Sequence, residues 1–387
     1  MITIPYGRQD VNEEDIAAVE TVLRSDWLTQ GPAVERFEEA VRTYCGASHA
    51  VAMNSATSAL HLACRALELG PGDALWTSPN TFVASANAAL YCGARIDFVD
   101  IDPRTYNMSV AALSEKLEKA RKAGRLPKVV MPVHFAGQSC QMEEIASLAK
   151  QYKFSVIEDA SHAIGGQYKG KAVGSCVHSA ITVFSFHPVK IVTTGEGGMA
   201  VTQDSGLASR MRLLRSHGVT RDPGQMSSKA HGPWFYEQID LGYNYRMTDI
   251  QAALGASQMG RIEEFVMKRQ ALAKRYDDLL ADLPLLLPWQ SPLSRSAYHL
   301  YPICLDRDRS SLSRSQVFAC LRENGIGANV HYIPVHTQPY FRAFGFDVGD
   351  FPQAERYYAD AISLPLHPRL QDEDLLRIVA VLRQVLL

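Results

Sequence analysis

The sequence predicts an α/β protein in which a large, doubly wound domain is followed by a smaller α+β unit. In roughly the first two-thirds of the chain, helical patterns alternate with short apolar runs, as expected for a parallel sheet between helices. After residue 285 the pattern becomes a mixture of single strands and helices. A length of 387 residues also exceeds what one hydrophobic core usually serves. We therefore expect two packed domains.

The elements of the large domain alternate along the chain. Apolar residues at helical spacing predict helices over 34–44, 57–69 and 81–91. Short apolar runs predict buried strands over 95–102, 128–135, 154–160 and 179–186. A further strand is expected over 197–204, followed by a helix over 205–216 that ends near His217 and Gly218.

The pattern changes at residue 220. Residues 220–245 are polar and aromatic and predict a long loop, and 248–280 predict two helices that lead into the second unit. Beyond these helices, the smaller α+β unit is expected from the segments 298–306, 313–324, 328–336 and 371–386.

Composition and charge exclude several classes of protein. Lys and Arg number 39 against 41 Asp and Glu, so no global positive field would attract nucleic acid. The seven cysteines are odd in number and contain no CxxC pair, which predicts reduced thiols. The N-terminus has no charged segment followed by an apolar one, and no apolar stretch reaches membrane-spanning length. We expect a cytoplasmic protein without a membrane partner.

Asp159 and Lys190 are the strongest candidates for chemistry. Each follows an apolar run, and ligands of open α/β sheets bind at the carboxyl ends of the strands. Taken alone, the pair could equally be a structural salt bridge. However, Lys190 lies between a proline turn and the glycine-rich segment 193–198, where no helix or long strand accounts for it. A desolvated lysine has a lowered pKa and can attack a carbonyl, which makes Lys190 a Schiff-base candidate.

Two other segments add parts of a cofactor site. Residues 54–60 open a helix with small and hydroxyl side chains, which suits an anion, although simple N-capping is the plainer explanation. Phe82 could stack on a ring or pack in the core. Together with Lys190 and Asp159, these parts match what pyridoxal 5'-phosphate (PLP) requires: a lysine, a carboxylate, a phosphate site and an aromatic ring.

The chain resembles the DegT/DnrJ/EryC1/StrS family of PLP-dependent sugar-nucleotide aminotransferases from Tyr6 to the last helix. The segments that show the resemblance are 27–32 (WLTQGP), 54–60, 81–82, 158–160, 185–198 and 242–249. The resemblance implies the aspartate-aminotransferase-like fold (PLP fold type I), with a mainly parallel seven-stranded sheet. It implies a large PLP-binding domain with the N-terminal segment at 1–255 and a small C-terminal domain at 256–387.

The resemblance also implies roles for single residues. Lys190 would form the internal aldimine and later act as the base, and Asp159 would pair with the pyridine nitrogen. The other implied cofactor contacts are Ala56, Thr57, Phe82, His162, Ser185 and Asn244, with His162 near the ring hydroxyl and Phe82 on the ring. Ala56, Thr57 and Ser185 would hold the phosphate.

Asn244 would reach the phosphate of a neighbouring subunit, so the resemblance implies a homodimer with active sites at the interface. Many family members have Gln where this chain has His162, and Gly where it has Ala56. Relatives with histidine at the position of Lys190 are dehydratases, so the lysine favours transamination.

Within the family, the chain is most similar to the C4 aminotransferases of pseudaminic acid biosynthesis. This similarity implies that L-glutamate aminates a UDP-2-acetamido-2,6-dideoxy-4-keto-hexose (β-L-arabino), giving UDP-4-amino-4,6-dideoxy-N-acetyl-β-L-altrosamine with ping-pong kinetics. The implied substrate contacts are Tyr6, Asp26, Trp27, Leu28, Thr29, Ala56, Ser185, Asn244, His331, Tyr332, Ile333 and Pro334. The alternative is another nucleotide-linked keto sugar, carried by UDP or dTDP and aminated at C3 or C4.

Other classes are less well supported. No HExxH or similar spacing occurs, so no metal is expected, and His134, His178 and His187 are interpreted as hydrogen-bonded core histidines. A non-catalytic cofactor-binding relative would not need both Lys190 and Asp159. For His217, His331 and Arg246, a ligand contact and a structural role remain equally open.

Overall fold

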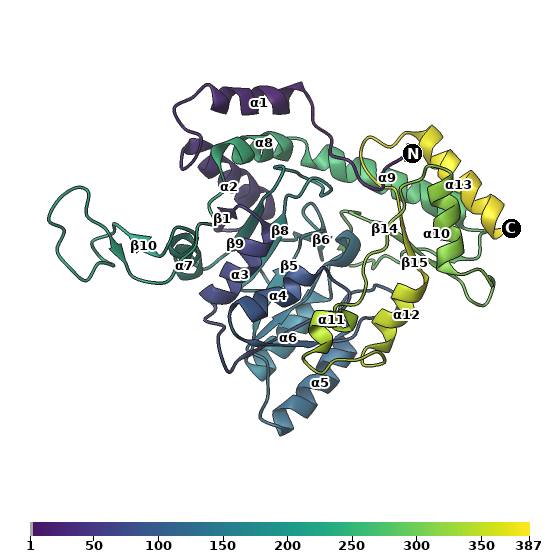
Figure 1. Ribbon diagram of the computed structural model, residues 1–387, viewed down its shortest axis with the longest axis horizontal. Helices are drawn as coiled ribbons and strands as arrows, with labels where there is room; N and C mark the ends of the chain where they lie inside the picture. Colours follow the sequence, from purple (N-terminus) through teal and green to yellow (C-terminus); the bar gives the residue numbers. More distant parts are fainter. Residues whose placement is uncertain (1–2) are drawn as a thin grey trace.

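A seven-stranded sheet forms the centre of the structure, a computed structural model that describes residues 3–387 (Figure 1). Its strand order is β1-β9-β8-β5-β4-β2-β3, and only β9 runs antiparallel to its neighbours. The strands are β1 (His49–Met53), β2 (Ala74–Thr77), β3 (Arg95–Phe98), β4 (Val129–Met131), β5 (Ser155–Asp159), β8 (Ile181–Ser185) and β9 (Gly198–Thr202). The mainly parallel α/β sheet expected from the sequence is confirmed.

Helices cover both faces of this sheet. Ile157 and Val183 point into the core shared with α3 (Ala56–Ala66), α4 (Val83–Tyr91) and α7 (Ser205–Arg215). Val156 and Phe184 point to the opposite face. That face is covered by α2 (Pro32–Cys45), α5 (Val110–Lys122), α6 (Met142–Tyr152) and α8 (Asp249–Met259). Because both faces are buried, the strands are nearly continuous apolar runs.

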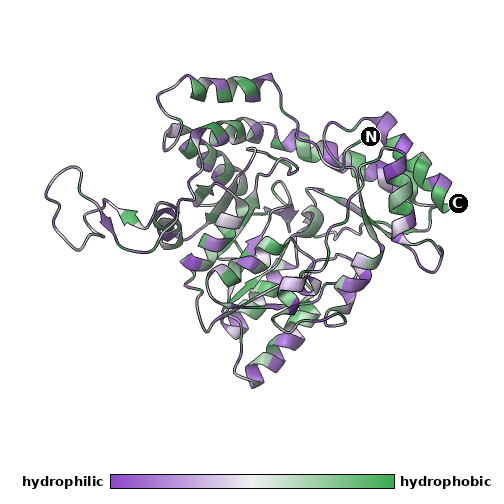
Figure 2. Cartoon of the chain, in the orientation of Figure 1, coloured by the Kyte–Doolittle hydropathy of each residue, from purple (hydrophilic) through white to green (hydrophobic). Residues whose placement is uncertain are grey.

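Local sequence accounts for where the helices begin and end. Pro32 occupies the first turn of α2, and Gly46 ends that helix with a left-handed φ of 71°. Thr248 and Gln251 form a capping box at the start of α8. The outer helix α5 combines hydrophilic and hydrophobic residues (Figure 2), and it buries only Leu113 and Leu117. Within residues 3–387, no helix combines the length and apolar composition needed to cross a bilayer.

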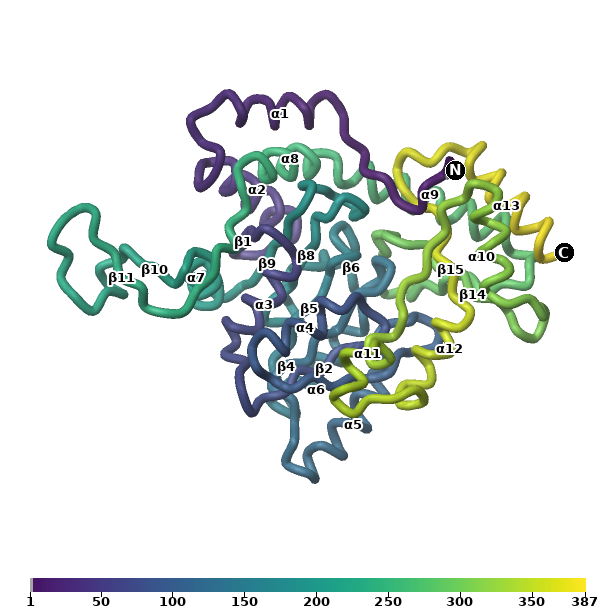
Figure 3. Tube along the Cα trace, in the orientation of Figure 1, coloured from purple at the N-terminus to yellow at the C-terminus, as the bar shows by residue number. Residues whose placement is uncertain are grey.

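The C-terminal part of the chain forms a second core. The long helix α9 (Ile262–Leu280) leads into a three-stranded antiparallel sheet of β12 (Leu285–Leu286), β14 (Tyr301–Leu305) and β15 (Ala361–Leu364). The helices α10 (Arg314–Glu323) and α13 (Asp372–Leu386) pack in this second core. The helices α11 (Pro339–Arg342) and α12 (Pro352–Asp360) instead bury Phe341, Ala354 and Tyr357 in the core of the large sheet. The N-terminal segment lies beside the second core (Figure 3), because Ile4 is buried in it and pairs with Ile326. The helix α1 (Glu13–Leu23) follows.

The segment expected as a long loop projects from the body as an arm (Figures 1 and 3). Two short antiparallel strands, β10 (Val219–Thr220) and β11 (Glu237–Gln238), join its two sides. Trp234, Tyr236 and Leu241 are exposed on or beside the arm. Three further short strands, β6 (Gln167–Tyr168), β7 (Lys171–Ala172) and β13 (Ser294–Arg295), form a separate small sheet.

Candidate active site

Asp159 lies at the carboxyl end of β5, on the face of the sheet that α3 and α4 cover. Its Oδ2 accepts a hydrogen bond from Ser85 Oγ at 2.6 Å, and its Oδ1 accepts one from Ser161 Oγ at 2.6 Å. The backbone N–H of Ser161 donates to the same Oδ1 at 3.1 Å. The buried carboxylate is therefore oriented from both sides, as a charged group inside a protein requires.

Lys190 lies in the turn after β8, where its backbone N–H donates to His187 O at 2.8 Å. Burial lowers the pKa of Lys190 to about 8, and the nearby Asp159 carboxylate opposes this shift. An amine with this pKa is partly unprotonated at neutral pH and can act as a nucleophile or a base. The structure thus brings the two strongest sequence candidates together.

The N-terminus of α3 lies beside these two residues in the fold. Ser185 ends β8 and pairs with Gly198 of β9, and a Cβ at Gly198 would collide with the backbone of Ser55 and Ala56. The side chain of Ser55 accepts from Ser58 N, but the first N–H groups of a helix have no partner within it. In the part of the chain that the structure describes, Ala56 and Thr57 therefore present N–H groups that suit an anion.

A cluster of imidazoles lies close enough to Lys190 for its charge to lower the pKa of His162, His299 and His331. His162 Nδ1 accepts from the N–H of Ala136 at 3.3 Å, so the hydrogen-bond pattern assigns the ring proton to Nε2, which lies 3.0 Å from Tyr332 Oη. Burial lowers the pKa of His162 well below its usual range, and the charge of Lys190 adds to the effect. His162 is therefore a neutral donor to Tyr332.

Residues from both ends of the chain complete this cluster. His331 Nδ1 lies 2.8 Å from Ser363 Oγ, and burial lowers the pKa of His331 to about 3. The ring of Tyr6 is 5.6 Å from that of His331. His299, which sequence reasoning missed, packs on His162 with ring centroids 4.4 Å apart.

Phe82 is exposed. It is the N-cap residue of α4, its side chain is 60% exposed, and its ring centroid lies 6.3 Å from that of Tyr332. The alternative that Phe82 packs in the core is wrong, because α4 begins one residue later than Phe82 and leaves the ring outside. Exposure at the edge of the site is compatible with a stacking role.

Several other expected site residues are not in contact with this cluster. The segment 26–29 lies at the start of α8: Thr29 pairs with Thr248, and Leu28 O accepts from the N–H of Asp249. Trp27, Leu28 and Ile333 are about half exposed, Asp26 and Asn244 are exposed, and Pro334 is buried. Across residues 3–387, no hydrogen bond or ring contact joins these residues to Lys190 or Asp159. Their roles stay predictions.

Other residues were missed or misjudged. Ser85, which orients Asp159, was missed. The one feature of the sequence that could have indicated it is its place one helical turn after Phe82, which predicts that the two residues lie on the same side of the helix. Asp249 accepts from the N–H groups of Gly31 and Ala33 at 2.8 and 2.9 Å and so caps α2 from a distant helix. The expectation that His187 is a core histidine is wrong, since its side chain is exposed.

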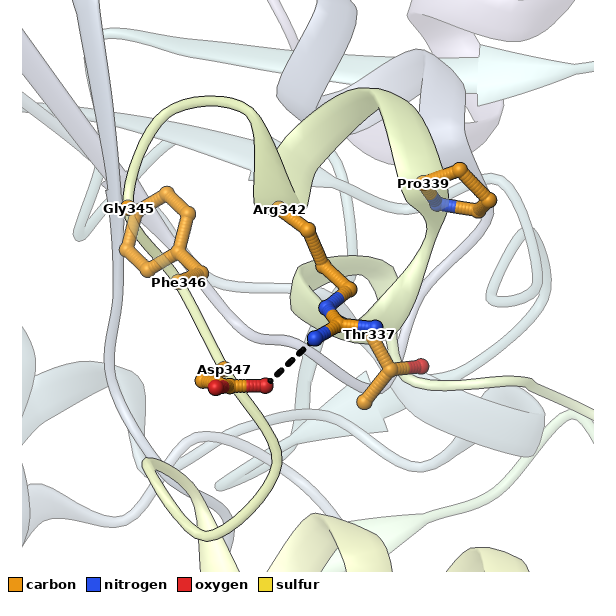
Figure 4. Close-up of a pocket in the computed structure, with 6 residues that line it drawn as sticks. All are labelled: Thr337, Pro339, Arg342, Gly345, Phe346 and Asp347. Carbon is orange, nitrogen blue, oxygen red and sulfur yellow. Dashed lines mark hydrogen bonds and ion pairs between the residues drawn. The ribbon is translucent and has the colours of Figure 1, made fainter.

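The open hollow beside α11 does not belong to this site. It measures about 470 Å³ and is lined by Thr337, Pro339, Arg342, Gly345, Phe346 and Asp347 (Figure 4). An ion pair between Arg342 and Asp347, 3.0 Å long, spans it. None of the expected site residues lines it.

The chemistry of the Lys190 site fits PLP. Lys190 offers an amine of lowered pKa, and Asp159 offers a buried carboxylate. The start of α3 offers free N–H groups on the same face of the sheet, where a glycine at 198 allows close backbone approach. Groups of these kinds would suit the aldehyde, the ring nitrogen and the phosphate of this cofactor.

Comparisons with known proteins agree with this chemistry. A family model described as the DegT/DnrJ/EryC1/StrS aminotransferase family matches residues 9–383. The chain is 39% identical over 389 residues to the UDP-4-amino-4-deoxy-L-arabinose–oxoglutarate aminotransferase of Shewanella sediminis, covering 99% of this chain and 98% of that one.

Two solved structures are similar over nearly the whole chain. Helicobacter pylori PseC, an aminotransferase involved in the biosynthesis of pseudoaminic acid, superposes with a TM-score of 0.90 at 34% identity, covering 99% of both chains. The PLP form of the putative sugar aminotransferase Spr1654 from Streptococcus pneumoniae gives a TM-score of 0.88 at 30% identity, covering 99% of this chain and 100% of that one.

Proposed function

The chain belongs to the DegT/DnrJ/EryC1/StrS family of PLP-dependent sugar aminotransferases, and from this premise we propose its substrates. L-Glutamate donates its amino group to C4 of a UDP-2-acetamido-2,6-dideoxy-4-keto-hexose (β-L-arabino). The product is UDP-4-amino-4,6-dideoxy-N-acetyl-β-L-altrosamine, used for pseudaminic acid. The observation that carries the reaction class is Lys190, an amine of lowered pKa beside the oriented carboxylate of Asp159.

The likeness to H. pylori PseC, which is named for this pathway, supports the sugar. The oxoglutarate in the name of the Shewanella relative supports L-glutamate as the donor, because glutamate and 2-oxoglutarate are the two sides of one exchange. Both supports come from relatives at 34 and 39% identity.

In the proposed reaction Lys190 has two tasks. Its unprotonated Nζ would hold the cofactor through its aldehyde group, and when free it would move a proton from the donor carbon and later to the sugar carbon. PLP, when bound, supplies the electron sink that makes this proton removable. Asp159 would hold a proton on the pyridine nitrogen of the cofactor, and Ser85 and Ser161 fix the two carboxylate oxygens.

The remaining side chains bind and orient. The N–H groups of Ala56 and Thr57 and the Ser185 hydroxyl would hold the phosphate at the positive end of α3. His162 would lie near the ring hydroxyl of the cofactor, and Phe82, which is exposed, would cover the ring.

The sugar nucleotide would be bound by three segments: Tyr6, residues 26–29 and residues 331–334. Tyr6 and His331 already lie together beside the cluster around Lys190. Asn244 has an exposed side chain, which supports the proposal that it serves the phosphate of a second subunit in a homodimer. The exposed aromatic residues of the arm are consistent with burial against that subunit.

A second candidate is a different nucleotide-linked keto sugar, carried by UDP or dTDP and aminated at C3 or C4. The 39% identity to an enzyme named for UDP-4-amino-4-deoxy-L-arabinose favours it, because that sugar differs from the one proposed.

The first test is a visible spectrum of the purified protein, recorded before and after L-glutamate and then after the UDP-4-keto sugar. Bleaching by glutamate, recovery with the sugar, and one nitrogen gained at C4 by mass and NMR are expected. A dTDP-4-keto-6-deoxy sugar is the matched control. Bleaching without recovery would refute the proposed sugar and keep the aminotransferase, whereas no cofactor band at all would refute the site.

A further inference from the structure

A second carboxylate, Glu158, lies directly behind Asp159 on the opposite face of the sheet. Successive side chains of a strand point to opposite faces, so Glu158 points away from Lys190. Its Oε2 lies 2.6 Å from Nε2 of His134, and its Oε1 accepts from Ser179 Oγ at 2.5 Å and from Thr182 Oγ1 at 2.9 Å. Glu158 is thus a buried carboxylate with three hydrogen-bond donors.

These donors keep the carboxylate charged. Burial raises the pKa of Glu158, but the hydrogen bonds from His134, Ser179 and Thr182 outweigh it and leave that pKa below its usual range. The N–H of Cys140 donates to His134 Nδ1 at 3.1 Å, so the ring proton lies on Nε2 and points at Glu158. The ring of His134 is therefore held from both sides.

The backbone of His134 holds Asp159. The N–H of His134 donates to the carbonyl oxygen of Asp159 at 3.0 Å, and the N–H of Asp159 donates to Pro132 O at 2.9 Å. His134 is thus bound twice to two adjacent residues. Its ring contacts the side chain of Glu158, and its backbone N–H donates to the carbonyl oxygen of Asp159. A shift of the loop 132–134 would move the peptide that carries the Asp159 carboxylate.

We propose that Glu158 and His134 are positioning residues. They hold the carboxylate of Asp159 where its proposed role, keeping a proton on the pyridine nitrogen of the cofactor, would require it. The inference rests on the function proposed above for Asp159. The separation in sequence supports it, because the loop that holds Asp159 follows β4, whereas Glu158 and Asp159 belong to β5. Among the described residues, the other hydrogen bonds between this loop and the end of β5 are the two backbone bonds. Small displacements matter here, since about 1 Å can cost on the order of 100-fold in rate.

Two variants of the holoenzyme test the proposal. His134→Asn/Glu158→Leu removes the contact together with the buried charge, while Asn keeps an acceptor for the N–H of Cys140. Removing the whole pair avoids the unpaired carboxylate that His134→Asn alone would leave. Glu158→Gln keeps the shape, and its amide still bridges His134 and the two hydroxyls, so it is the conservative rescue.

We expect the double variant to lose about tenfold or more of kcat, with KM for L-glutamate within about threefold. Glu158→Gln should stay within about threefold of wild type, because a neutral hydrogen bond keeps roughly half the strength of a charged one. The visible band of the bound cofactor, titrated with pH, should change its midpoint in the double variant.

The matched control is His336→Asn/Glu355→Leu. His336 is also buried and lies 2.9 Å from a carboxylate, Glu355 Oε1, in the C-terminal part of the chain. The same two changes there should lower the melting temperature comparably and leave kcat and the cofactor band unchanged.

The inference is overturned if the folded double variant keeps kcat and the midpoint of the cofactor band within the range of the control. It is also overturned if Glu158→Gln loses as much kcat as the double variant. Asp159→Asn distinguishes a failure of the proposed function of Asp159 from a failure of the positioning role of Glu158 and His134. An active Asp159→Asn enzyme would refute the proposed function of Asp159, whereas an inactive one beside a normal double variant would refute only the role of Glu158 and His134.

Discussion

The pKa of Lys190 gives a prediction that can be measured without any sugar substrate. Burial lowers this pKa to about 8, against an ordinary value of 10.5. In the cofactor-free enzyme, the amine should therefore react with an acylating reagent far below the pH at which ordinary lysines do. Its reactivity should fall with decreasing pH through a midpoint near 8, because only the unprotonated amine is nucleophilic.

The size of the effect follows from the two pKa values. At pH 7.5, roughly a quarter of an amine with a pKa of 8 is unprotonated, compared with about one in a thousand for a pKa of 10.5. The ratio is about 240-fold. Access to a partly enclosed side chain reduces the absolute rate but leaves the midpoint of the pH profile unchanged.

Competitive acetylation with trace acetic anhydride measures this profile. The cofactor is first removed, the reaction is run from pH 6 to 11, and the label at Lys190 is quantified by peptide mass spectrometry. A lysine model amide in the same tube, the reference compound, corrects for reagent hydrolysis. Lys190→Ala identifies the peptide, and the holoenzyme, in which the proposed function has Lys190 covalently occupied, should show no label there.

If the midpoint for Lys190 lies within about half a pH unit of the midpoint for the lysine amine of the reference compound, the reasoning is refuted. That result would show that burial does not penalise the charged amine. A profile without a midpoint across this pH range would refute it as well.

Three further outcomes are expected. Asp159→Asn should slow the half-reaction with L-glutamate by about 10²- to 10⁴-fold in stopped flow, and a near-normal rate would show that another group protonates the ring. Phe82→Ala should raise the dissociation constant of PLP by about 2- to 13-fold, measured by fluorescence titration, since a lost aromatic contact costs about 0.5–1.5 kcal/mol; unchanged affinity would argue against stacking. Asp249→Ala should lower the free energy of unfolding by about 1–2 kcal/mol in urea, because the N–H groups of Gly31 and Ala33 lose their acceptor. An unchanged urea midpoint would contradict this.

Local patterns predicted most of the sheet and the helices around it. The apolar run at 154–160 contains β5, and the helix expected over 205–216 is α7 almost residue for residue. The period of the apolar residues indicates whether a segment is a helix or a strand and which of its sides faces the core. Both can be predicted from the segment alone. The proximity of Asp159 and Lys190 could also be predicted, because Asp159 ends β5 and Lys190 follows β8, two parallel neighbours in one sheet.

Contacts between distant segments could not be predicted from local sequence patterns. His162 meets Tyr332 across 170 positions, and nothing in either local sequence indicates the other. His134 was expected to be a core histidine and is buried, but its partner Glu158 lies on a different strand. His187 was misjudged because it follows a buried strand, although the strand ends two residues before it and the chain turns out to solvent.

The site draws on both ends of the polypeptide, and this has a consequence for synthesis. Ile4 pairs with Ile326, Tyr6 packs on His331, and Tyr332 bonds to His162. A ribosome must therefore deliver the chain at least as far as Tyr332 before this pocket can close, however early the central sheet forms. Chains that terminate before Tyr332 should lack the complete pocket, so the colour of bound cofactor in a preparation would report how much of its product extends past that residue.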